Sequence, residues 1–155
     1  MLTTFWSAEL TEMIGENYLI KLTDNVMQSM ANYVGGSCDG LVYCLRQEGL
    51  NVSWGNISFG SSGVSKRALK ERFNNFNSLF NGIHKKQMMW EVPDLELRTK
   101  LHQTILDKVV SPYRSFLGRF TSHIDRGKHP ERYIRYSADE LGSKISALFS
   151  YHSNL

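Results

Sequence analysis

The sequence has 155 residues, enough for one domain with a substantial buried core, and 41% of them are hydrophobic. No stretch of about 18 apolar residues could cross a bilayer, and the first residues lack the basic start and small-residue cleavage site of a secretory signal. Cys38 and Cys44 lack the spacing of a zinc site, so we expect reduced thiols in a cytosolic protein.

The net charge of +3 is unevenly distributed along the chain. Residues 108–135 contain seven basic and two acidic side chains, a local charge of +5, whereas the other 127 residues sum to −2. This asymmetry indicates an anionic partner for one end of the molecule, although most charge clusters are only solvated faces.

The N-terminal third of the chain predicts two helices. In residues 16–33, apolar side chains recur at three- and four-residue steps, which predicts one core-facing stripe. Gly35 and Gly36 are expected to end or kink this helix, and a shorter helix over 41–46 is expected to stop at Gly49. The stripe consists of Leu19, Leu22, Val26, Met30 and Tyr33.

Residues 51–64 are rich in Gly, Ser and Asn and predict a loop. Val52, Trp54 and Ile57 alternate as in a strand, but the glycines in and beside the run argue against one.

The clearest predicted helix begins near Ser65 and ends near Trp90, before Pro93. Its apolar side chains step by three and four, and we expect the stripe of residues 19–30 to pack on them. Its polar face is expected to be a solvated surface away from the other basic residues. The apolar stripe is Leu69, Phe73, Phe76, Phe80 and Ile83, and the polar face carries Lys66, Arg67, Lys70 and Arg72.

Two further helices are expected in the C-terminal half. Asp94 begins the first, Pro112 is expected to kink or break it, and it resumes to about Ile124. Ser137 and Glu140 have the spacing of a capping box and begin the last helix. Together these patterns predict an all-α bundle of about six helices without a sheet, forming a single domain over 1–155.

The sequence contains no recognisable catalytic constellation. The five histidines are scattered without metal-ligand spacing, and no nucleophile motif or phosphate-binding glycine motif follows a strand. We therefore expect a non-enzymatic protein without cofactor or metal.

The segment HPERYIRYSADEL, residues 129–141, places Arg132 and Arg135 between aromatic residues just before the last helix. We expect the rings of Tyr133 and Tyr136 to pack on the bundle with their hydroxyls at the surface, so that both arginines point outward.

Several motifs together resemble the C-terminal end of the exocyst seventy-kilodalton subunit family, especially its plant-type branch. The pattern VPDLELRTKLHQTILDKVVSPYRSFLGRF is followed by HPERYIRYSADEL, and CLRQEG and SSGVSKRALKERFNNFN lie upstream in the same order. The resemblance runs from about Gly15 to Phe149, whereas residues 1–14 match poorly. Family members are several times longer than this chain.

The resemblance implies a rod of stacked helical bundles that helps tether secretory vesicles to the plasma membrane in exocytosis. The family binds phosphatidylinositol 4,5-bisphosphate through basic residues, which fall here on Lys128, Arg132 and Arg135; Arg114 and Arg119 are weaker candidates suggested by charge. The implied partners are other exocyst subunits, anionic phosphoinositides and small GTPases, and the implied location is cytoplasmic and peripheral at the plasma membrane.

Two other functions remain open from the residues alone. A protein-interaction scaffold would use the basic end to hold an acidic partner helix. A nucleic-acid-binding module would need stacking residues beside the charge, and only His129, Tyr133 and Tyr136 qualify, so nucleic acid is not the expected partner.

Overall fold

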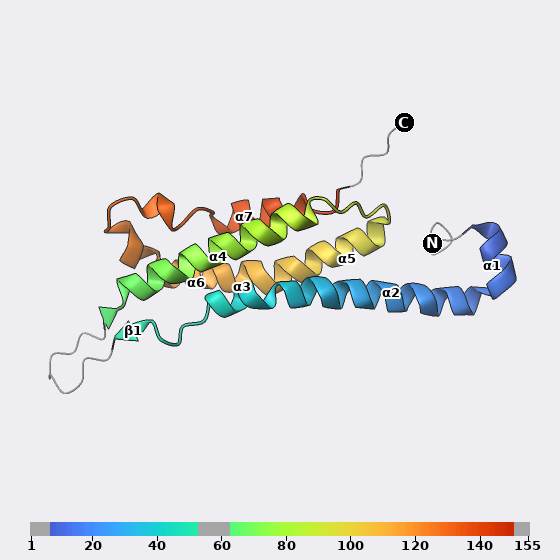
Figure 1. Cartoon of the computed structure of the whole chain (residues 1–155), viewed down its shortest axis with the longest axis horizontal. Helices are drawn as coiled ribbons and strands as arrows, with labels where there is room; N and C mark the ends of the chain where they lie inside the picture. Colours follow the sequence, from blue (N-terminus) through green and yellow to red (C-terminus); the bar gives the residue numbers. More distant parts are fainter. Residues whose placement is uncertain (1–6, 53–62, 151–155) are drawn as a thin grey trace.

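The computed structural model describes residues 7–52 and 63–150, which form an elongated bundle of helices lying side by side (Figure 1). The predicted all-α fold is confirmed. No helix of this described part is both long and apolar enough to cross a membrane. The helical elements are α1 (Ala8–Ile14), α2 (Glu16–Ser37), α3 (Asp39–Cys44), α4 (Lys66–Gln87), α5 (Leu95–Ile105), the π-helical turn η2 (Leu106–Val110), α6 (Ser111–Asp125), the 3₁₀ turn η3 (Pro130–Arg132) and α7 (Ala138–Ser146).

A very small strand pair connects α3 to α4. Strands β1 (Asn51–Val52) and β2 (Gly63–Val64) pair antiparallel, with Val52 opposite Gly63. Val52 therefore belongs to a strand in a segment predicted to be a loop, because its backbone pairs across the base of the connection. Trp54 and Ile57, the other residues of the alternating pattern, lie outside the described residues.

Helix α2 differs from its prediction in length and in buried face. It passes through Gly35 and Gly36 and ends at Ser37. The predicted stripe is wrong at two of its residues, because Val26 is 37% exposed and Tyr33 is 50% exposed. Leu22 and Met30 are half-buried, and Met30 packs against the core. The buried side instead follows four-residue steps, at Leu19, Thr23, Met27 and Ala31, and continues to Val34.

A polar residue in this buried face explains the error. Thr23 is only 2% exposed, and its hydroxyl donates to the backbone oxygen of Leu19 at 2.8 Å. The threonine thereby satisfies its polar group within its own helix and can be buried. An apolar periodicity alone could not identify this face.

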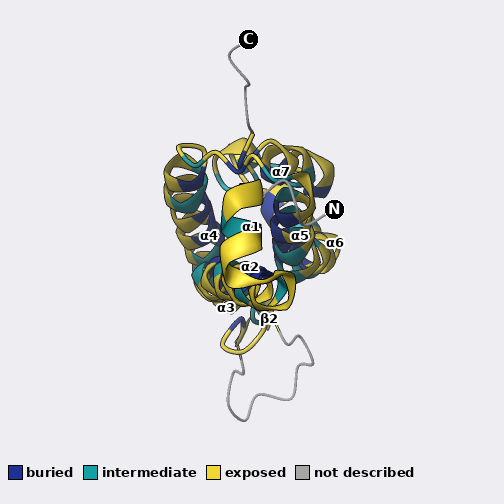
Figure 2. Ribbon diagram, turned by 90° about the vertical axis from the view of Figure 1, so that its right-hand side faces the viewer, coloured by how far each residue is buried: buried dark blue, intermediate teal, exposed yellow. Residues whose placement is uncertain are grey.

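The packing partner of α2 is also different from the predicted one. Helix α2 packs mainly on α5, and the short α3 packs on α4. Viewed along the bundle, α4 lies opposite α5 and α6, and the buried residues face the space between them (Figure 2). The expectation that the 19–30 stripe covers the phenylalanines of α4 is therefore wrong.

Helix α4 follows its prediction closely. The Ser65 side chain accepts from the backbone nitrogen of Ala68 at 3.2 Å and caps the helix. The stripe is buried at all of its residues except Ile83, which is half-buried. Phe76 stacks on Tyr113 with ring centroids 4.7 Å apart, so this stripe packs on α6.

Helices α5 and α6 form one long helix with an altered turn. Asp94 caps its start, accepting from the Leu97 nitrogen at 2.7 Å. The expected break at Pro112 is absent, because the π-helical turn η2 immediately before α6 accommodates the proline's missing donor. In this turn the Lys108 ammonium donates to the Gly35 backbone oxygen at 2.7 Å and joins the end of α2 to the long helix.

Candidate functional site

The basic surface lies on the segment between α6 and α7, residues 126–137, here called the basic connector. It turns back at His129, whose φ of 60° and ψ of 58° are left-handed, and continues into η3. In Figure 1 the connector occupies the same end of the bundle as the start of α4. Most of its residues are exposed, which suits a surface contact.

Three hydrogen bonds fix the backbone and rings of the connector. Asn77, buried in α4, donates from Nδ2 to the Tyr133 backbone oxygen at 2.7 Å. The Tyr136 hydroxyl donates to Asn81 Oδ1 at 2.8 Å, and the Tyr113 hydroxyl donates to the Tyr136 backbone oxygen at 2.8 Å. The connector is therefore held by α4 and α6 at residues spaced along its second half.

The two tyrosines have the mixed role that was predicted, with one difference. Both side chains are half-buried, and the Tyr136 ring meets Phe80 edge-on with centroids 5.6 Å apart. However, the Tyr136 hydroxyl is bonded to Asn81 rather than only to water. The rings thus anchor the segment that carries the two arginines.

The three strongest predicted site residues, Lys128, Arg132 and Arg135, are all exposed on this connector. In the described parts of the chain none of them forms an ion pair with a carboxylate. Glu131 lies between them in sequence, and its Oε1 is 3.0 Å from His129 Nδ1. Hydrogen bonding from its own backbone nitrogen, with smaller contributions from His129 and Arg132, lowers the Glu131 pKa, so this carboxylate stays charged.

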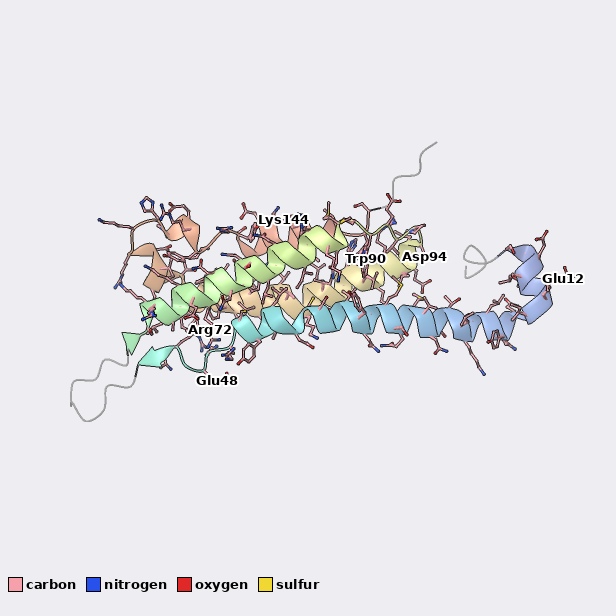
Figure 3. All side chains as sticks on the ribbon, in the orientation of Figure 1. Glu12, Glu48, Arg72, Trp90, Asp94 and Lys144 are labelled. Atoms are coloured by element: carbon pink, nitrogen blue, oxygen red, sulfur yellow. The ribbon has the colours of Figure 1, made fainter. Side chains whose placement is uncertain are left out.

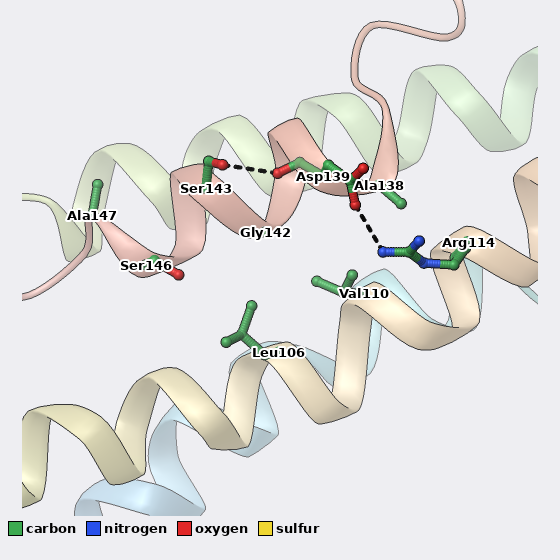
Figure 4. A pocket seen from close by; sticks show the side chains of 9 residues that line it. All are labelled: Leu106, Val110, Arg114, Ala138, Asp139, Gly142, Ser143, Ser146 and Ala147. Carbon is green, nitrogen blue, oxygen red and sulfur yellow. Dashed lines mark hydrogen bonds and ion pairs between the residues drawn. The ribbon is translucent and has the colours of Figure 1, made fainter.

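The weaker candidates Arg114 and Arg119 are placed on α6 and have partners of their own. Arg114 Nη2 lies 2.9 Å from Asp139 Oδ1 at one end of an open groove of about 660 Å³ between η2, α6 and α7 (Figure 4). Arg119 donates to Gln47 Oε1. Neither guanidinium is therefore as available to an anion as the residues of the connector.

Lys70 is the basic residue whose location the sequence prediction missed. Its ammonium lies over the Tyr133 ring, 5.0 Å from the centroid, so it contacts the connector rather than a distant solvated face. Lys66 and Arg67 are exposed in the first turn of the same helix. No local pattern could have revealed this, because the contact joins residues far apart in sequence.

The chemistry available to this surface is that of cationic hydrogen-bond donors. Arginine donates parallel hydrogen bonds to phosphate oxygens through its planar fork, and lysine adds a mobile point charge. In the described residues no three side chains of His, Cys, Asp or Glu gather as a metal site would require. The chemistry of these side chains therefore suits contact with an anionic group.

Comparison with known proteins confirms the predicted family. The sequence model for the C-terminal region of the Exo70 exocyst complex subunit matches residues 1–147. From Arabidopsis thaliana, exocyst complex component EXO70C1 is 34% identical over 92% of this chain and 21% of its own length, and EXO70A1 is 35% identical over 92% and 23%. Human exocyst complex component 7 is 36% identical over 54% of this chain and 11% of its own length.

A solved chain agrees in fold. It is reported with the structures of exocyst subunit Exo70p and the Exo84p C-terminal domains, and it superposes with a TM-score of 0.63 at 24% identity over 91% of this chain and 25% of its own length. The present chain spans about a fifth of the length of EXO70C1 and EXO70A1, its Arabidopsis relatives named above. With this shared helical fold and a family match over most of its residues, the chain belongs to the family defined by the C-terminal region of the Exo70 exocyst complex subunit.

Proposed function

We propose that this chain is a non-enzymatic exocyst component that helps tether secretory vesicles to the plasma membrane. In this role it acts in the cytoplasm and at the membrane periphery, together with other exocyst subunits and small GTPases. Its own contribution is to bind phosphatidylinositol 4,5-bisphosphate through Lys128, Arg132 and Arg135. Family membership supports the exocyst role, since several relatives are exocyst complex components.

One observation carries the lipid-binding part of the proposal. The connector exposes three basic side chains without ion-pair partners among the described residues, yet its backbone is bonded to buried Asn77 and Tyr113. A flexible loop would lose conformational freedom when its arginines met a phosphate group, whereas a fixed one loses less. The connector therefore presents cations in a preorganised form.

The expected affinity is moderate. Each basic side chain near an anionic membrane contributes about 1 kcal/mol. Three of them give about 3 kcal/mol, which is roughly a hundredfold in partitioning. Stable membrane attachment would then depend on additional contacts made by the rest of the complex.

The test compares two triple charge reversals in liposome co-sedimentation. The first variant changes Lys128, Arg132 and Arg135 to Glu. The control changes Lys21, Lys85 and Lys100 to Glu, because these lysines are exposed, lie on α2, α4 and α5 away from the connector, and give the same change in net charge.

The liposomes contain phosphatidylinositol 4,5-bisphosphate, phosphatidylserine at equal charge, or only neutral lipid, and duplex DNA is measured at the same salt. We expect the connector variant to lose binding to the phosphoinositide liposomes while circular dichroism shows unchanged helix content. Equal loss in the control, or stronger binding to DNA than to the phosphoinositide liposomes, would contradict the proposal.

A further inference from the structure

A small pocket of about 160 Å³ opens between the C-terminal halves of α2 and α4. Tyr33 of α2 forms one wall together with Trp90, which lies just after the end of α4, at the turn into α5 (Figure 3). The volume is below the roughly 300–1,000 Å³ of sites for drug-sized ligands, so the pocket suits a single side chain. The other lining residues are Ser37, Gly82, Ile83, Lys86 and Gln87.

The two rings of this wall stack on each other and are only partly covered. Their centroids are 5.5 Å apart with 24° between the ring planes, and Tyr33 is 50% exposed. The Trp90 ring also meets buried Phe149, with centroids 6.4 Å apart, so the core holds it in place. Met88 and Met89, directly before Trp90, are 49% and 80% exposed. Contiguous exposed apolar residues of this kind mark interaction sites.

Polar groups beside the rings are available to a partner. No described residue accepts a hydrogen bond from the Trp90 indole nitrogen. Lys86 donates from Nζ to the Tyr33 hydroxyl at 3.3 Å, and in the described parts of the chain it forms no ion pair. Below them, the buried Gln87 amide donates to Ser37 Oγ at 3.3 Å. The pocket therefore combines an aromatic wall, an unpaired donor and one positive charge.

This combination favours an extended peptide over a helix. An amphipathic helix docks through several anchors along a groove, and a pocket for one side chain cannot hold them. A polyproline II segment has no internal hydrogen bonds, so its carbonyl oxygens can accept from an indole N–H, and proline rings pack on exposed aromatic side chains. Lys86 carries the only charge among the described lining residues, which favours carboxylates beside the prolines.

We propose that this pocket binds a proline-containing, acidic segment of a partner protein in extended conformation. One proline ring fills the pocket against Tyr33 and Trp90, and the Trp90 N–H donates to a carbonyl oxygen of the segment. A carboxylate beside the proline pairs with Lys86. The site is formed by α2, α4 and the turn after α4, and it does not depend on the lipid binding proposed for the connector.

The first experiment selects random peptides by phage display on the purified chain, with counter-selection on Gly82→Leu. Gly82 lines the pocket, and a Cβ at this position meets no atom within 4 Å, so the leucine enters open space. Leucine is also the better helix former, so this variant is expected to fold. We expect the selected peptides to be enriched in proline flanked by Asp or Glu. No enrichment, or enrichment of basic or helical peptides without proline, would overturn the proposal.

Fluorescence anisotropy with a selected peptide then compares two matched variants. Gly82→Leu should weaken binding about tenfold or more, because the leucine occupies the pocket. The control is Gly118→Leu, since Gly118 is an exposed helical glycine of α6 with the same open space around its Cβ position and does not line the pocket. Equal weakening in the two variants, or none in Gly82→Leu, would contradict the site.

Two further measurements test the assigned contacts. The indole N–H signal of Trp90, identified by its loss in Trp90→Phe, should shift in NMR spectra when the peptide is added. Lys86→Glu should weaken binding of the acidic peptide about tenfold, and it should hardly affect a version whose carboxylates are replaced by amides. An unmoved indole signal, or equal effects of Lys86→Glu on both peptides, would show that the peptide binds elsewhere and would overturn the proposal.

Discussion

The hydroxyl of Tyr113 donates a hydrogen bond to the backbone oxygen of Tyr136 at 2.8 Å, which joins α6 to the residue before the cap of α7. Tyr113 is fully buried, and its ring stacks on Phe76. We predict that Tyr113→Phe lowers the free energy of unfolding by about 1–2 kcal/mol, because the Tyr136 oxygen loses its donor while the ring packing remains. Urea unfolding followed by circular dichroism measures the change, and an unaltered midpoint would contradict it.

The same tyrosine predicts a loss of stability in alkali. Burial raises the Tyr113 pKa well above its usual range, so the folded state retains a proton that the unfolded chain releases near pH 10. The contribution of the protonated Tyr113 hydroxyl to the free energy of unfolding is therefore complete below about pH 10. It is lost as the pH rises further, by up to about 1.4 kcal/mol per pH unit. Tyr113→Phe should show a shallower decline in unfolding free energy between pH 10 and 11. Identical slopes would show that this proton is not linked to folding.

The buried face of α2 predicts that alanine substitutions at two neighbouring residues differ in their effect on stability. Met27 is 6% exposed and belongs to the core, whereas Val26 is 37% exposed. Met27→Ala should lower the free energy of unfolding by about 2–3 kcal/mol, since it leaves a cavity. Val26→Ala should change it by less than about 0.5 kcal/mol. Thermal and urea unfolding of the two variants measure these losses. A larger loss of stability for Val26→Ala than for Met27→Ala would support the buried face predicted from the sequence.

The contacts of Arg72 predict that two conservative substitutions on α4 differ in their effect on stability. Its guanidinium donates to the backbone oxygens of Glu48 at 2.7 Å and Arg46 at 3.2 Å. Arg72→Lys should cost about 1–2 kcal/mol, because lysine cannot reach both oxygens with a planar fork. Arg67→Lys is the matched control and should be nearly neutral, since Arg67 is exposed. Equal effects in urea unfolding would mean that the Arg72 contacts contribute little.

The two cysteines are predicted to be unreactive in the folded protein. Both thiols are free and buried, and burial raises the pKa of Cys38 and of Cys44. Since the thiolate is the reactive form, Ellman's reagent should modify them slowly in buffer and rapidly in urea. Fast modification of both in buffer would show that the α2–α3 region opens readily.

The helix caps of this fold could be predicted from the sequence, because the residues that form each cap lie within one helical turn of one another. Ser137 and Glu140 form both hydrogen bonds of the predicted capping box, at 3.1 Å and 2.7 Å. Ser65 and Asp94 cap their helices where their residue types and positions indicate. These interactions depend on neighbouring residues and need no knowledge of the tertiary arrangement.

Features that depend on distant segments could not be read in this way. The buried face of α2 is set by its contact with α5, and two adjacent faces of α2 both carry apolar residues, including Val26 and Met27. Likewise, the contact of Lys70 with Tyr133 exists only because α4 and the connector lie together in the bundle. The arginines of the candidate site were identified by charge and family resemblance, but their neighbours on α4 required the structure.

The π-helical turn η2 also bears on how the chain could tolerate insertions and deletions. From Leu97 to Tyr113 the buried residues of the long helix recur every four positions. In a regular α-helix, which turns about 100° per residue, this stripe would drift about 160° away from the core over the stretch. An additional residue accommodated within the wide turn removes about 100° of that drift.

The long helix thus contains one residue more than a regular helix would need to keep Leu97 and Tyr113 on one side. Deleting exposed Asp107 should convert the turn to regular helix and leave both flanking faces in the core. The deletion would instead rotate Lys108 away from the Gly35 oxygen that it now contacts. A homologous chain shorter by one residue at this place would keep the same core and lack this link to α2.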